Sequence, residues 1–157
     1  MRAGLSQLKP GTLGGGGDLV IRGSRLCRGI QYEITKPLQI IEHCHCSMCR
    51  KSHGAAFATD AFVMREDFRW SQGEADLARY ESSPGTYRCF CRLCGSRLAM
   101  EPRELPQALV VYLGTLDDDP VGRPGAHIFA DDLAVWYQIA DSLPRYSRGL
   151  DSPRSKA

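Results

Sequence analysis

Cysteine is the residue type whose spacing most clearly indicates chemistry in this chain, with seven cysteines among 157 residues. A first group has the spacing Cys-x-Cys-x-x-Cys and consists of Cys44, Cys46 and Cys49. A second group repeats that spacing and consists of Cys89, Cys91 and Cys94, while Cys27 stands alone upstream. Zinc prefers thiolate ligands, and a Cys-x-x-Cys turn supplies two of them from one tight loop. The spacing therefore predicts zinc binding.

Metal binding explains these cysteines better than disulfide bonds do. No apolar run approaches the roughly 20 residues that cross a bilayer, and the N-terminus lacks the apolar core and cleavage site of a signal peptide. We therefore expect a cytoplasmic protein, and the cytoplasm keeps thiols reduced. An odd number of cysteines in closely spaced pairs also argues for metal ligands.

The spacing alone allows two ways of dividing the ligands. One is a single closed structural site, built from Cys46, Cys49, Cys91 and Cys94. The other has two sites, of which the first uses Cys44, Cys46 and Cys49 and the second uses Cys27, Cys91 and Cys94. A zinc ion with three protein ligands keeps an open position for chemistry, whereas a closed site only stabilises the fold.

Length and charge restrict the architecture and the partners. The chain has the size of one ordinary domain, and its net charge of +2 is spread along the sequence. Nucleic-acid binding relies on concentrated positive charge, so we expect no nucleic acid and no membrane as partners. We assign residues 1–22, which contain four consecutive glycines, to a flexible extension, 23–146 to the domain and 147–157 to a loose polar tail.

Short apolar and alternating runs predict a mainly β domain. From Leu26 to Ile34 the period is two, which is typical of a strand, and Cys27 would lie at its start. Further strands are expected at residues 38–41, 55–63, 87–90, 98–101, 109–113 and 127–129. Residues 68–70 and 77–81 are expected to pair as a hairpin.

Two helical segments are expected among these strands. One helical turn would carry Cys49 to His53 and end at Gly54, because glycine readily adopts the left-handed conformation that ends helices. The apolar spacing over residues 133–143 predicts a helix, with Asp131 or Asp132 as its N-cap. We expect the core to include Trp70, Tyr112 and Trp136.

Three segments of the sequence resemble a known family. They are Gly23–Glu33 (GSRLCRGIQYE), His43–Ser52 (HCHCSMCRKS) and Arg88–Ser96 (RCFCRLCGS). Later parts that fit the same pattern are Gly114–Asp118, His127–Phe129 and Trp136. In this order, over about residues 23–146, the segments resemble the glutathione-dependent formaldehyde-activating enzyme family.

The resemblance implies a β-tent fold, in which several coiled antiparallel β-sheets carry zinc knuckles. It implies a catalytic zinc ion on Cys44, Cys46 and Cys49. It also implies a second, structural zinc ion, bound by Cys91, Cys94 and a Cys-x-Cys pair that ends at Cys27.

One position departs from that pattern. The first cysteine of the Cys-x-Cys pair falls at position 25, where this sequence has Arg25, and a protonated guanidinium cannot ligate zinc. Cys89 is a substitute ligand to consider, because it lies two residues before Cys91 and would point to the same face of a strand. Water as the fourth ligand and an empty site are the alternatives.

The resemblance implies a carbon-sulfur lyase activity that joins glutathione and formaldehyde to give S-(hydroxymethyl)glutathione. The expected partners are thus a small thiol and an aldehyde, and a homodimer is one assembly to consider. The alternative function is a zinc-stabilised binding or glutathione-carrier module of the same fold without catalysis. An open coordination position on the zinc ion would favour the catalytic function over the binding or carrier function.

Several charged or polar side chains near the cysteines could assist. Arg50, Lys51 and His53 either receive the carboxylates of glutathione or form a solvated charged turn. His45 could support the zinc ligands by hydrogen bonding or serve as an alternative fourth ligand, although an exposed, uninvolved imidazole is the simpler expectation. His127 is either an acid or base of the site or a hydrogen-bonded structural histidine. Arg88 either neutralises thiolate charge or faces solvent.

Overall fold

The structure is a computed structural model that describes residues 19–38 and 40–156. In this part of the chain the fold is mainly β, with ten strands and one α-helix, α1 (Ser47–His53), which confirms the predicted fold class. Most of the expected N-terminal extension, residues 1–18, lies outside the described residues. None of the helices in the described ranges is long and apolar enough to cross a membrane.

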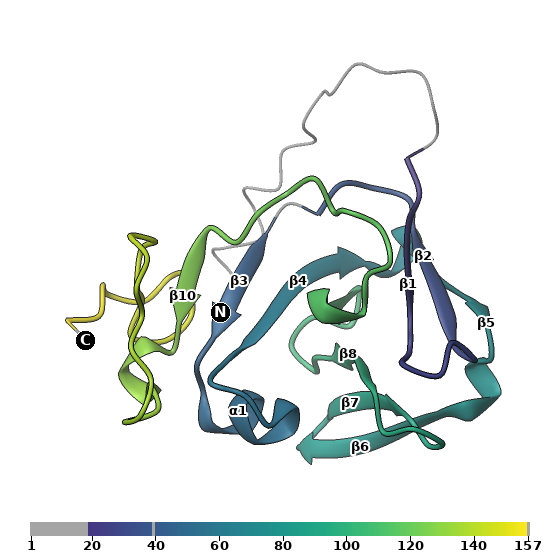
Figure 1. Ribbon diagram of the computed structural model, residues 1–157, viewed down its shortest axis with the longest axis horizontal. Helices are drawn as coiled ribbons and strands as arrows, with labels where there is room; N and C mark the ends of the chain where they lie inside the picture. Colours follow the sequence, from purple (N-terminus) through teal and green to yellow (C-terminus); the bar gives the residue numbers. More distant parts are fainter. Residues whose placement is uncertain (1–18, 39, 157) are drawn as a thin grey trace.

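The strands form two sheets (Figure 1). The smaller sheet has the order β1-β2-β5, with bounds β1 Ile21–Ser24, β2 Gln31–Ile34 and β5 Phe68–Gln72. The larger sheet has the order β10-β3-β4-β9-β8-β7-β6. Its strands are β3 Ile41–Cys44, β4 Ala58–Met64, β6 Leu77–Ser83, β7 Thr86–Cys91, β8 Arg97–Glu101, β9 Ala108–Tyr112 and β10 Ala126–Ile128. Among the described pairs, β10 with β3 is parallel and the others are antiparallel.

The main core lies where the two sheets meet. Tyr32 and Ile34 of the smaller sheet pack in one cluster with side chains of the larger sheet such as Val111. In β2 the buried positions alternate with more exposed ones, as expected for a strand with one face on the core. All five residues of β9 are buried, which agrees with the apolar run predicted for residues 109–113.

The first cysteine group lies between a strand and the helix. Strand β3 ends at Cys44, and α1 follows almost at once (Figure 1). Gly54 ends the helix in the left-handed conformation, at φ 61° and ψ 34°, which confirms the predicted C-cap. The remaining short elements are 3-10 helices at Arg65–Asp67, Glu74–Asp76, Leu113–Thr115 and Ala130–Asp132.

The helix predicted for residues 133–143 is wrong. Only a 3-10 turn at Ala130–Asp132 forms, and Leu133 then leaves the helical region with ψ 138°. The buried side chains of this segment, Ala134 and Ile139, are held by tertiary packing instead of a helical stripe. Trp136 was expected in the core but is 70% exposed.

The hairpin predicted for residues 68–70 and 77–81 is also wrong. Strand β5 pairs with β2 of the smaller sheet, whereas β6 pairs with β7 of the larger one. The aromatic ring of Tyr32 explains the choice, because Phe68 and Trp70 both pack against it, with ring centroids 5.2 and 5.8 Å away.

The edges of several predicted elements are shifted. Strand β1 begins at the buried residue Ile21, two residues before the expected start of the domain. Strand β2 begins only at Gln31, so Cys27 lies in the preceding turn. The tail folds back, because Phe129 N donates a hydrogen bond of 2.9 Å to Arg148 O and Tyr146 forms a β-bridge with Arg154.

Candidate functional site: two thiol clusters

The fold brings the predicted catalytic cysteines together. The Sγ atoms of Cys44, Cys46 and Cys49 all lie within 4.8 Å of one another. Cys44 is the last residue of β3, Cys46 is the N-cap of α1, and Cys49 lies in its first turn. We name these three residues the first cluster.

Local backbone structure directs the three sulfurs to one point. Cys46 Sγ accepts a hydrogen bond of 3.3 Å from the backbone N–H of Cys49, so the thiol acts as the helix cap. Cys44 and Cys49 are buried and pack with Ala58 and Ile128 in a small apolar group. Cys44 and Cys49 are therefore largely shielded from water, whereas Cys46 is half-buried.

The thiols of the first cluster suit a metal ion. Hydrogen bonds from the other two thiols, supported by backbone N–H groups of α1, lower the pKa of Cys46 to about 2. The same hydrogen bonds raise the pKa of Cys44, because its proton is shared with Cys46 and Cys49. Three thiolates so close together would repel one another, and a divalent cation between them would let all three ionise. The donor set thus fits zinc.

Arg88 links the first cluster to the large sheet. This residue is 4% exposed, with Nη1 donating to Tyr112 Oη at 3.1 Å and Nη2 lying 4.0 Å from Cys49 Sγ. Burial raises the pKa of Tyr112, so the phenol keeps its proton. The ring of His53 packs edge-on against Tyr112, with centroids 4.3 Å apart. Arg88 faces the cysteines, which was one of the two alternatives, and not solvent.

Two buried carboxyl groups lie next to this group. Asp60 of β4 is the Cα partner of both Glu42 of β3 and Tyr112 of β9. Burial raises the pKa of Asp60 well above its usual range and that of Glu42 to about 7. Repulsion between like charges couples these groups, because Cys46 helps to raise the pKa of Asp60 and Asp60 helps to raise the pKa of Cys49. Neither carboxyl group was predicted from the sequence, although an aspartate inside an apolar strand was an available signal.

The histidines form a buried chain beside the first cluster. His45 is fully buried, against the simpler expectation of an exposed ring, and its Nε2 lies 2.8 Å from His127 Nδ1. His127 Nε2 in turn lies 3.0 Å from Asp141 Oδ1. Both ring nitrogens of His127 are hydrogen-bonded, which favours the structural alternative for this residue.

The basic residues after Cys49 lie on α1 near the surface. Arg50 Nε donates a hydrogen bond of 3.1 Å to His45 O, which ties the helix to the cysteine loop. Lys51 is exposed, and His53 is half-buried with no hydrogen-bond partner for Nε2 among the described atoms.

Three of the four remaining cysteines also come together, and Cys89 is the exception. The Sγ atoms of Cys27, Cys91 and Cys94 lie within 4.8 Å of one another, and we name these residues the second cluster. Hydrogen bonds to the Ser96 side chain and backbone lower the pKa of Cys94 to about 6. Cys89 is not part of the cluster but is buried in the main core.

The prediction of Cys89 as a substitute ligand is therefore not supported by the geometry. The sulfur of Cys89 is not among those grouped around Cys91, because its side chain packs in the main core. Arg25 approaches the second cluster instead, with Nη1 donating to Cys91 Sγ at 2.8 Å. A guanidinium has no lone pair for a metal, so this donor set does not fit a four-ligand zinc site.

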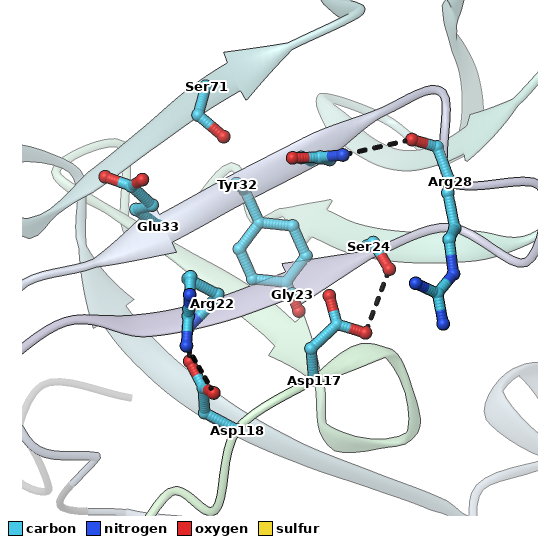
Figure 2. Close-up of a pocket in the computed structure, with 10 residues that line it drawn as sticks. Arg22, Gly23, Ser24, Arg28, Tyr32, Glu33, Ser71, Asp117 and Asp118 are labelled. Atoms are coloured by element: carbon cyan, nitrogen blue, oxygen red, sulfur yellow. Dashed lines mark hydrogen bonds and ion pairs between the residues drawn. The ribbon is translucent and has the colours of Figure 1, made fainter.

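A cavity of about 360 Å³ lies elsewhere, against the smaller sheet (Figure 2). Its wall includes the ion pair between Arg22 Nε and Asp118 Oδ2, at 2.8 Å, and the hydrogen bond from Ser24 Oγ to Asp117 Oδ1, at 3.0 Å. No cysteine lines this cavity. We therefore place the thiol chemistry at the clusters.

Comparisons with known proteins agree with this geometry. No match was found among curated proteins. A crystal structure of a Rhodobacter sphaeroides protein is similar in fold, with a TM-score of 0.55 and 24% identity over 66% of this chain and 96% of that chain. The family described as glutathione-dependent formaldehyde-activating enzyme matches residues 20–132, which include both cysteine clusters. Because this match covers well over half of the sequence, the chain belongs to the glutathione-dependent formaldehyde-activating enzyme family.

Proposed function

We propose that this protein joins glutathione and formaldehyde to give S-(hydroxymethyl)glutathione, acting as a carbon-sulfur lyase. In this reaction the thiol sulfur forms a bond with the carbonyl carbon, the C=O π bond breaks, and the thiol proton ends on the new hydroxyl group. The observation that carries the proposal is the convergence of Cys44, Cys46 and Cys49 in a chain of this family.

Cys44, Cys46 and Cys49 are the residues that would hold a zinc ion. A zinc ion with three thiolate ligands supplies an open position and Lewis acidity that favour the ionised form of a substrate thiol. The protein contributes a closely packed, mostly buried knuckle that keeps the three sulfurs in place.

Tyr112 is the best placed proton donor for the carbonyl oxygen. Its hydroxyl accepts the Nη1–H of Arg88, and no described group accepts the proton of the hydroxyl itself. Arg88 contacts both Tyr112 and Cys49, so the phenol lies close to the first cluster. The neighbouring cation strengthens a hydrogen bond from Tyr112 to an oxygen that gains negative charge.

The basic residues of α1 are the proposed contacts for the carboxylates of glutathione. Arg50 and Lys51 follow Cys49 directly, and Lys51 is exposed. Charge-assisted hydrogen bonds from these side chains would orient the peptide while its sulfur reaches the first cluster.

The test measures catalysis and metal content together. Glutathione and formaldehyde also combine without an enzyme, so exchange rates should be measured by NMR at equilibrium, with and without protein. We expect acceleration by the wild type, and loss of both zinc and acceleration in Cys46→Ser. Acceleration that persists in a zinc-free Cys46→Ser variant would refute the proposal. Glutathione binding without any acceleration by the wild type would instead establish the non-catalytic carrier function.

A further inference from the structure

Arg25 brings a positive charge into the second cluster. Its side chain is 5% exposed, and Nη1 donates a hydrogen bond of 2.8 Å to Cys91 Sγ. This residue stands where the resemblance predicted a cysteine ligand. Because a guanidinium stays protonated and offers no lone pair, the cluster has a cation in the region where zinc would need a fourth ligand.

Gly29 provides the space for this guanidinium. A Cβ atom at Gly29 would lie 1.6 Å from Arg25 Nη2 and 2.5 Å from Arg25 Cζ. The turn around it is fixed by backbone hydrogen bonds, since Arg25 N donates to Ile30 O at 3.1 Å and Arg28 N donates to Arg25 O at 2.8 Å. The position of the guanidinium is therefore built into the turn.

Asp76 supplies an anionic partner for Arg25. Its Oδ2 lies 3.5 Å from Arg25 Nη2, and its Oδ1 accepts from Arg92 Nη2 at 3.1 Å. The backbone N–H of Arg92 also donates to Asp76 O at 3.1 Å. A buried cation needs such pairing, so these contacts allow Arg25 to remain charged inside the cluster.

The sulfur of Cys91 is satisfied without a metal ion. It accepts hydrogen bonds from the backbone N–H groups of Leu93 and Cys94, at 3.1 and 3.2 Å, in addition to the bond from Arg25. The sulfur therefore has three hydrogen-bond donors around it, all of them from the protein.

These contacts make the same connection that a structural zinc ion would make. The Arg25–Cys91 bond joins the turn after β1 to the end of β7. Leu26 N donates to Ser96 Oγ at 3.0 Å, and the thiols of Cys27 and Cys94 are hydrogen-bonded to each other. The two turns are thus held together by protein groups alone.

We infer that the second cluster is a metal-free thiol site, in which the Arg25 guanidinium replaces a structural zinc ion and leaves Cys27 and Cys94 open to modification. Solvent exposure makes Cys27 and Cys94 the residues open to modification, because Cys27 is exposed and Cys94 is half-buried, whereas Cys91 is fully buried. The ligands of this site would be thiol-directed electrophiles.

The test maps alkylation in the purified, zinc-saturated full chain. We expect iodoacetamide to modify Cys27 and Cys94 at a rate that a chelator does not change, as followed by peptide mass spectrometry. Protection of both residues, abolished by a chelator, would overturn the inference. Zinc content gives an independent readout, with one ion per chain supporting the inference and two ions per chain overturning it.

Substitutions of Arg25 provide the matched comparison. Arg25→Cys restores a four-thiol set, and we expect it to raise the zinc content by one ion per chain and to slow alkylation of Cys94 at least tenfold. Arg25→Ser removes the guanidinium without adding a ligand, and we expect its zinc content to equal that of the wild type. Both variants keep Cys44, Cys46 and Cys49, so zinc at the first cluster is an internal reference.

Discussion

Removing only the hydroxyl of Tyr112 tests the proposed proton donor. In Tyr112→Phe, the buried Arg88 loses its 3.1 Å partner, and a hydrogen bond to a charged group contributes about 1.5–3 kcal/mol to the free energy of unfolding. For a domain of this size, that loss lowers the melting temperature by about 3–12 °C. Loss of a positioned proton donor should also slow the catalysed exchange by about 100-fold.

The assay is the NMR exchange rate between glutathione, formaldehyde and their adduct, at a temperature where circular dichroism shows the variant to be folded. Zinc content should stay unchanged, because Tyr112 is not among the cysteines of the first cluster. Tyr80→Phe is the matched control, since the Tyr80 side chain is 60% exposed on β6. An unchanged exchange rate in a folded, zinc-loaded Tyr112→Phe protein would show that the phenol donates no proton.

Three further predictions concern the pH dependence, the second cluster and the tail. Burial, aided by the charges of Arg88 and Arg97, lowers the pKa of His53 to about 4 from its ordinary value of 6.5. Between about pH 4 and 6.5, His53 therefore binds a proton in the unfolded chain but not in the folded protein. The free energy of unfolding is highest above this range and falls as the pH is lowered through it. His53→Gln should reduce this loss in acid titrations followed by fluorescence. Gly29→Ala should lower the free energy of unfolding by about 1–3 kcal/mol, measured by urea unfolding, because the added Cβ meets the Arg25 guanidinium. The loss should be clearly smaller when Arg25→Ser is also present. Deleting residues 147–157 should lower the melting temperature, because Arg148 O accepts a hydrogen bond from Phe129 N and Leu150 packs beside the first cluster. An unchanged melting temperature would support the expectation of a loose tail.

The sequence predicted best what is determined by neighbouring residues. Cys44, Cys46 and Cys49 converge because one strand end and one helical turn lie within six residues, and Gly54 ends that helix by its own conformational preference. The apolar run of β9 was recognisable because every position is buried. These features require no knowledge of distant partners.

Features that depend on distant partners were missed. The choice of β2 as the partner of β5 rests on Tyr32, more than 30 residues away, and a local pattern cannot specify it. The apolar residues after Asp132 suggested a helix, but Tyr137 packs on His45 instead, with ring centroids 6.1 Å apart. Likewise, Asp60 and Tyr112 meet only because β4 and β9 are neighbours in the sheet.

Strand β7 connects the two clusters and gives the second one a role in positioning the first. Successive side chains of a strand point to opposite faces, so Arg88 projects toward Cys49 while Cys89 and Cys91 project into the main core. A shift of one residue in the pairing register of β7 would turn the Arg88 side chain into the core and away from Tyr112. The hydrogen bond from Arg25 fixes Cys91 at the end of this strand, and it thereby helps to hold the register on which the position of Arg88 depends.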